Sequence, residues 1–150
     1  MRDIDASWLA CFVDGEGSLM LVRDVRPRNQ GGYHYSPVIS ASNTCLDLVE
    51  HCVELAGGYL VRVSRLPPKK TAYYWRLKGR AVARTLEAIY PYLIAKRQQA
   101  DILLAVRRDM VNGCRPGRRS TRLTMKELHF RQTAYWIMKA LNARGHSSTP

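Results

Sequence analysis

Acidic residues are scarce in this chain, and the scarcity narrows the choice of partner. Its 150 residues hold 12 Asp and Glu against 24 Lys and Arg, a formal net charge of +12. Such an excess favours a polyanionic partner, with nucleic acid first among the candidates. Long apolar runs, a signal peptide and a strongly apolar basic helix are also lacking, so a membrane surface is the weaker candidate. We therefore expect an intracellular protein that is not secreted and binds no membrane.

Cysteine and histidine are too few and too dispersed to form a familiar metal motif. The chain has four of each, with neither C-x-x-C nor H-x-E spacing among them. This pattern argues against a zinc finger and against a zinc nuclease or deaminase. It predicts reduced cysteines that bind no metal.

The most informative segment is residues 9–17, which read Leu-Ala-Cys-Phe-Val-Asp-Gly-Glu-Gly. Its apolar half is typical of a helix and its glycines of a helix end, so Asp14 and Glu16 fall at the C-terminal end. Acidic side chains there meet the negative end of the helix dipole, which costs up to ~1 kcal/mol. A hard divalent cation would offset that cost, because Mg²⁺ and Ca²⁺ prefer carboxylate and carbonyl oxygens. A solvated surface turn is the alternative, and the segment taken alone favours it.

Hydrophobic periodicity predicts an α+β protein. Two-residue alternation indicates strands, and spacing of three to four residues indicates helices around them. The expected strands cover residues 18–28, 33–42, 59–65 and 71–78. The expected helices after the first cover residues 44–56, 79–89 and 91–106, with a last one following the capping box of Thr124 and Glu127. We expect one domain over residues 1–150, with a core over 1–112 and a basic loop and C-terminal helix over 113–150.

One face of the predicted sheet is polar and basic. If helices cover the other face, this face is free to enter a DNA major groove, where arginine reads guanine and Asp24 would accept from a cytosine amino group. The expected DNA-binding residues are Ser18, Asp24, Arg26, Arg28, His34, Ser36, Ser40, Arg62, Ser64, Tyr74, Arg76 and Lys78. In the basic segment after residue 107, Arg115, Arg118 and Arg119 would add sequence-independent phosphate contacts. A charged face that merely keeps the sheet soluble is the weaker alternative.

Residues 9–17 also resemble the motif of the LAGLIDADG homing endonucleases, which they match at the first, second, sixth and ninth positions. Weaker similarity extends over roughly residues 6–112. The resemblance implies an αββαββα fold with an antiparallel, saddle-shaped sheet, followed here by additional C-terminal helices. A single copy of the motif implies a homodimer whose motif helices pack together, with Ala10, Cys11 and Asp14 at the interface.

The same resemblance implies a set of catalytic residues. It places the metal-binding carboxylate at Glu16, with the Gly15 carbonyl beside it, and a catalytic lysine at Lys96. It also points to Ser42, with Asn43 adjacent, at the end of the second strand. A solvated helix cation is the alternative for Lys96, and residues that merely turn the chain or cap a helix are the alternative for Ser42 and Asn43.

The implied function is a site-specific endonuclease. As a homodimer it would bind a long pseudo-palindromic site in double-stranded DNA and make Mg²⁺-dependent staggered cuts in both strands, while Ca²⁺ would support binding without cleavage. The alternative is a non-cleaving protein of the same fold, either a regulator that binds DNA or a maturase that binds RNA.

Overall fold

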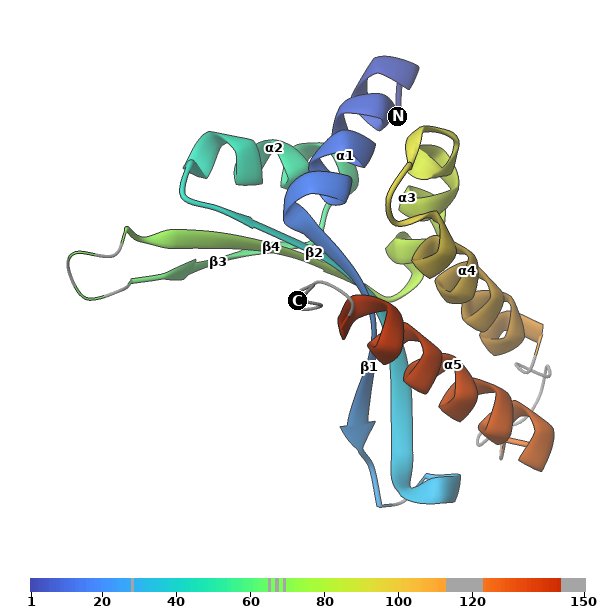
Figure 1. The fold of residues 1–150 in the computed structure, drawn as a ribbon. Coiled ribbons are helices and arrows are strands. Elements are labelled where there is room, and N and C mark those ends of the chain that lie inside the picture. The colour runs from blue at the N-terminus through green and yellow to red at the C-terminus, as the bar shows by residue number, and fades with distance from the viewer. Residues whose placement is uncertain (28, 65, 67, 69, 113–122, 144–150) are drawn as a thin grey trace, which may run out of the picture.

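The computed structural model describes residues 1–27, 29–64, 66, 68, 70–112 and 123–143 (Figure 1). The elements in chain order are α1 (Asp3–Glu16), β1 (Gly17–Val25), η1 (Gln30–Gly32), β2 (Tyr33–Asn43), α2 (Leu46–Ala56), β3 (Tyr59–Val63), β4 (Ala72–Lys78), α3 (Arg80–Ile89), η2 (Tyr90–Tyr92), α4 (Arg97–Asn112) and α5 (Met125–Ala143). The strands form one antiparallel sheet in the order β1-β2-β4-β3. The predicted α+β class and the predicted alternation of helices and hairpins are confirmed.

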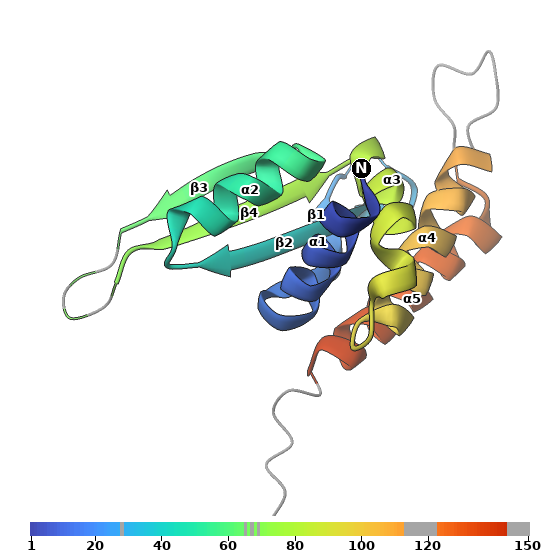
Figure 2. The same cartoon turned by 90° about the horizontal axis from the view of Figure 1, so that it is seen from above.

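The described helices all lie on one side of the sheet. The β1–β2 and β3–β4 hairpins run in very different directions from a common centre, which gives the sheet a strong twist (Figure 1). The view from above shows α1, α2 and α3 stacked over the strands and α4 and α5 side by side next to them (Figure 2). Leu19, Ile39, Trp75 and Leu77 alternate toward these helices and are at most 2% exposed. The opposite face of the sheet is left open.

The junction of α1 and β1 has no connecting loop. Gly17 ends the helix and begins the strand, and its amide donates a hydrogen bond to the Val13 carbonyl oxygen. Its φ of −97° is ordinary, so the glycine is required by space. A Cβ at this position would lie 2.6 Å from the Val13 carbonyl oxygen and 2.7 Å from the Val13 Cα. Because both are backbone atoms, a side chain could fit only if the end of the helix moved.

The C-terminal helix α5 is part of the core. Ala134 and Met138 are buried in the same cluster as the sheet residues. The Asn142 side-chain amide donates to the Leu19 carbonyl oxygen at 3.0 Å. The predicted capping box at its start is present, with Thr124 and Glu127 exchanging hydrogen bonds of 2.6 and 3.2 Å.

Two interactions of arginine side chains attach α5 to its neighbours. The Arg131 guanidinium donates to the Asp109 carboxylate on α4 at 2.7 Å, and both side chains are largely buried. The Arg23 guanidinium of β1 lies 4.4 Å from the Tyr33 ring centroid and 4.7 Å from that of Tyr135 on α5. Cation–π contacts of this kind contribute about 0.5–2 kcal/mol each.

One helical prediction was wrong. Residues 91–106 do not form one helix, because Leu93 is extended and α4 begins only at Arg97. The backbone amides between these two points are used for another purpose, described below. Among the described residues, no helix has the length and apolarity needed to cross a membrane.

Replacing Gly17 with Ala should lower the free energy of unfolding by about 1–3 kcal/mol, the usual cost of overpacking. Gly15→Ala is the matched control, because a Cβ added there would have nothing within 4 Å and alanine is favoured over glycine in a helix by up to ~1 kcal/mol. Urea denaturation of the two variants measures the difference. Equal stability of both would show that the close approach to Val13 does not constrain the junction.

Candidate active site

The C-terminal end of α1 presents one free carboxylate to solvent. Glu16 is the last residue of the helix and is exposed, as is Gly15 before it. No basic residue lies in the last turn to balance this charge, although the helix dipole makes the end electronegative. The carbonyls of a last helical turn have no amide partner within the helix. Glu16 and the Gly15 carbonyl therefore offer oxygen ligands where a cation is electrostatically favoured.

The Asp14 carboxylate makes a contact within the chain that was not predicted. Its carboxylate accepts hydrogen bonds from three successive backbone amides, those of Ile94 at 2.6 Å, Ala95 at 3.2 Å and Lys96 at 3.0 Å. These amides precede α4, where the helix dipole is positive and a carboxylate is stabilised. The predicted place of Asp14 in a dimer interface stays a prediction beside this contact within the chain. The contact also explains why residues 94–96 are not helical, since their amides face α1, whereas the Leu93 amide donates to the Tyr90 carbonyl oxygen.

Lys96 is brought to the same end of α1. Its backbone amide donates to the Asp14 carboxylate, and its side-chain Nζ donates to the Asp14 carbonyl oxygen at 2.5 Å. The side chain is part-buried, unlike a solvated helix cation. The structure thus places the predicted catalytic lysine against the last turn of α1, two residues before Glu16.

Ser42 and Asn43 lie at the end of β2, next to the same junction. The register pairs Gly17 with Ala41, so Ser42 is the next residue along β2 beyond the start of β1. The Asn43 side-chain oxygen accepts a hydrogen bond of 2.9 Å from the Cys45 amide. This is an Asx turn that leads the chain into α2. Asn43 therefore has a structural role, whereas Ser42 remains near the junction.

The donors at this junction suit a hard cation, but they are few. Among the described residues, no group of three or more His, Cys, Asp or Glu side chains converges on one point. One carboxylate and one backbone carbonyl are oxygen ligands of the kind that Mg²⁺ and Ca²⁺ prefer. The residues present therefore fit such a cation only as part of a site that water, phosphate oxygens or a second chain complete.

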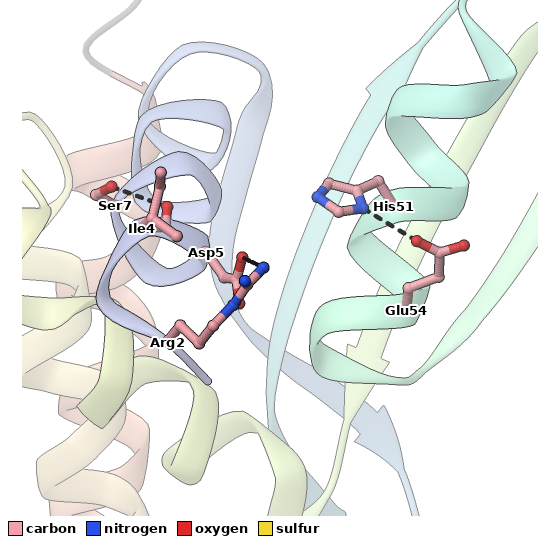
Figure 3. Close-up of polar contacts among 6 residues, drawn as sticks. All are labelled: Arg2, Ile4, Asp5, Ser7, His51 and Glu54. Carbon is pink, nitrogen blue, oxygen red and sulfur yellow. Dashed lines mark hydrogen bonds and ion pairs between the residues drawn. The ribbon is translucent and has the colours of Figure 1, made fainter.

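The exposed side of α1 carries small side chains. Ser7, Cys11 and Gly15 follow one another at four-residue spacing, with Ile4 one turn before them and 70% exposed. Figure 3 shows Ile4 and Ser7 on one side of the helix and the Arg2–Asp5 ion pair on the side nearer α2.

Of the predicted interface residues, only Cys11 lies on this exposed stripe. Ala10 is 0% exposed within its own chain, so its predicted contact with a partner is corrected. The thiol of Cys52 is also buried, and burial raises its pKa to about 12. Cys45, by contrast, is exposed.

The open face of the sheet holds most of the predicted DNA-binding residues. The register places members of β1, β2 and β4 on this one face, because Ser18 pairs with Ser40, which pairs with Arg76. The predicted residues that share the face are Ser18, Asp24, His34, Ser36, Ser40, Tyr74, Arg76 and Lys78. Arg26 is exposed in the turn that follows β1. Arg28, Arg115, Arg118 and Arg119 lie outside the described residues.

Arg62 does not share this face, which corrects the prediction. It pairs with Tyr73, and its neighbour Leu60 pairs with Trp75, so Arg62 belongs to the side of the sheet that the helices occupy. Ser64 follows the end of β3 and has no partner in the sheet register. The polar character of Arg62 suggested the wrong face, because the segment Tyr-Leu-Val-Arg-Val has no clear alternation.

The sequence pattern missed a row of apolar side chains on the open face. Tyr59, Val61 and Val63 are each about 40% exposed and occupy alternate positions of the edge strand β3. Tyr59 pairs with Arg76, which places the row beside the basic residues of β4. The register of β3 with β4 would have been needed to predict this apolar row.

Solved structures share this architecture. The chain superimposes on I-Vdi141I, an archaeal intron-encoded homing endonuclease complexed with DNA, with a TM-score of 0.76 at 17% identity, covering 100% of this chain and 91% of that one. The homing endonuclease I-CvuI, in complex with its target, gives 0.73 at 20% identity over 93% and 82% of the two chains. I-SmaMI, a LAGLIDADG homing endonuclease bound to cleaved DNA, gives 0.64 at 17% identity over 86% and 42%.

The chain has the LAGLIDADG homing endonuclease fold. The resemblance noted for residues 9–17 is thereby confirmed at the level of the fold. No protein-family model matches the sequence, and no curated protein matches it.

Within the LAGLIDADG fold of this chain, Asp14→Asn should lower the free energy of unfolding by about 2 kcal/mol, the scale of hydrogen bonds to a charged group. An amide keeps one acceptor but directs its own N–H groups toward backbone donors. Urea denaturation measures the change. Asp24→Asn, an exposed carboxylate on the open face, is the control and should change stability by less than about 0.5 kcal/mol. If the two variants are equally stable, the contact with residues 94–96 does not support the fold.

Proposed function

We propose that this protein is a metal-dependent DNA endonuclease that acts as a homodimer. The observation that carries the proposal is the exposed Glu16 carboxylate, placed where α1 joins the first strand of an open, polar sheet face that carries Arg76 and Lys78. The proposed substrate is a double-stranded, pseudo-palindromic site, cut in both strands with a stagger. The named neighbours I-Vdi141I and I-CvuI were solved with DNA, which supports the choice of substrate.

Dimerisation follows from how few ligands one chain provides. The described part of the chain has no cluster of three or more possible metal-binding side chains, so a second copy of Glu16 is a natural source of the missing carboxylate. The exposed stripe of Ser7, Cys11 and Gly15 supports the same arrangement, because small side chains let two helices approach closely. This chain covers only 42% of I-SmaMI, a length that would accommodate two such units in one polypeptide.

The chemistry assigned to the site is hydrolysis of a phosphodiester. Water attacks phosphorus, and the bond from phosphorus to the 3′-oxygen breaks. Each cut strand then gives one fragment that ends in a 3′-hydroxyl, after the 3′-oxygen takes up a proton, and one fragment that begins with a 5′-phosphate. Glu16 and the Gly15 carbonyl would hold Mg²⁺, which supplies Lewis-acid stabilisation of the charge that develops on the phosphate. The Lys96 ammonium, held against the Asp14 carbonyl, would stabilise that charge further. Ser42 would position water beside the junction.

The open face would read the major groove. Arg76 and Lys78 would contact guanine and phosphate, and Asp24 would accept from cytosine. The row of Tyr59, Val61 and Val63 would pack against thymine methyl groups, which are the apolar feature of that groove. A selected half-site should therefore contain thymine where β3 lies, beside the guanine read from β4.

Glu16→Gln should abolish cleavage while DNA binding remains. The loss in single-turnover rate should exceed about 100-fold, because even outer-shell partners of a metal contribute 10–100-fold. The measurement selects duplexes from a randomised library in Ca²⁺, adds Mg²⁺ and maps new strand ends. Glu50→Gln, an exposed carboxylate on α2, is the matched control and should cleave as the parent does.

Other outcomes of the same selection would replace the proposal. A parent protein that binds selected duplexes tightly but leaves both strands intact in Mg²⁺ is a non-cleaving DNA-binding protein. Selection of no duplex at all, with retention of RNA, would favour a maturase-like role.

Cys11 should cross-link two copies of the chain. In a Cys45→Ser, Cys114→Ser background, mild oxidation or a short bis-maleimide should produce a covalent dimer through Cys11, since Cys52 is buried and its thiol stays protonated. Denaturing gel electrophoresis reads the result, and adding Cys11→Ser should remove the dimer. Sedimentation that shows a dimer without any Cys11 cross-link would mean that α1 is not the interface.

A further inference from the structure

A groove lies between α3 and α4 on the outside of the helix layer. Its volume is about 340 Å³, and each helix contributes four residues at positions i, i+3, i+4 and i+7. The lining residues are Arg80, Ala83, Arg84 and Glu87 from α3, and Leu104, Arg107, Arg108 and Val111 from α4. Two facing helical stripes of the same spacing thus form one continuous trough.

The groove carries unbalanced positive charge. Four arginines face a single glutamate. In the described part of the chain none of these arginines takes part in an ion pair, although Glu87 lies in the same groove. Arg80 and Arg84 are four residues apart on one helix, a spacing at which like charges cost about 0.2–0.5 kcal/mol. Folding alone gives no reason to gather these charges, whereas binding of an anion does.

The groove does not belong to the open sheet face. α3 directs Val82, Leu86 and Ile89 into the core, and α4 directs Leu103 and Val106 there. The lining residues occupy the other sides of both helices. α3 and α4 lie on the helix side of the sheet in both views (Figures 1 and 2). A duplex lying on the open face is therefore separated from the groove by the sheet and the core.

We propose that the α3–α4 groove binds the phosphate backbone of a single polynucleotide strand, as a second nucleic-acid site distinct from the sheet. The planar guanidinium matches two phosphate oxygens at once, and four of them along a trough suit successive phosphates. Ala83, Leu104 and Val111 would contact the sugars. Among the described residues, no aromatic side chain lines the groove, so base stacking contributes nothing there and binding is independent of sequence.

The test measures how salt weakens the binding of a fluorescent oligouridylate and, separately, an oligothymidylate. These strands lack base pairing, and the two arms distinguish RNA from DNA as the source of the backbone. Each phosphate contact on a single strand contributes about 0.7 to the slope of log K against log salt. Arg84→Gln with Arg107→Gln should lower that slope by about 1.4 for at least one of the strands.

Arg76→Gln with Lys78→Gln is the matched control, because it removes the same charge from the open face. This control variant should weaken duplex binding and leave the salt slope for single-strand binding unchanged. The groove variant should lower the salt slope for single-strand binding and leave duplex binding unchanged. This opposite pattern separates failure of the groove from failure of the nuclease proposal, since neither measurement requires cleavage.

Three results would overturn the groove proposal. One is a strand slope that the groove variant leaves unchanged. Another is full displacement of the strand by a duplex bound in Ca²⁺. The third is absence of strand binding while a poly-glutamate peptide binds the parent and not the groove variant, which would make the groove a site for an acidic protein segment.

Discussion

The contact of the Asp14 carboxylate with the amides of Ile94, Ala95 and Lys96 holds the candidate site together. It joins two segments that are some eighty residues apart in the sequence, the end of α1 and the approach to α4. The negative end of one helix is thereby coupled to the positive end of another through a carboxylate. Lys96 reaches the last turn of α1 because of this arrangement, and the next carboxylate along the helix, that of Glu16, is left uncommitted.

A second constraint is that the two sides of the sheet have different surroundings. Every described helix packs on one side, where Trp75 and Leu77 are buried, and the other side is left uncovered by these helices. The divergence of the two hairpins gives that free side a curved surface on which Arg76 and Asp24 lie at different places along the molecule. The helix side also carries charge, since four arginines line the groove on the outer surface of α3 and α4.

Much of this architecture could be predicted from the sequence, because its main signals are local. Period-two alternation located the strands closely, and the Thr124–Glu127 capping box is present as expected. Glu16 was singled out because residues 9–17 resemble the LAGLIDADG motif, since the carboxylates at the helix end taken alone favoured a solvated turn. What failed depended on distant partners. The contact of Asp14 was missed because its three amides lie far along the chain, and the face of Arg62 depended on how β3 pairs with β4.

The absence of a loop between α1 and β1 has a mechanical consequence. Gly17 caps the end of α1 and is the first residue of β1, and the backbone of Val13 leaves no room for a side chain there. A displacement of β1 therefore moves the end of α1 with it. The backbone at Glu16 is tied directly to the sheet, so strain applied to the strand would be transmitted to the end of the helix instead of being absorbed by a loop.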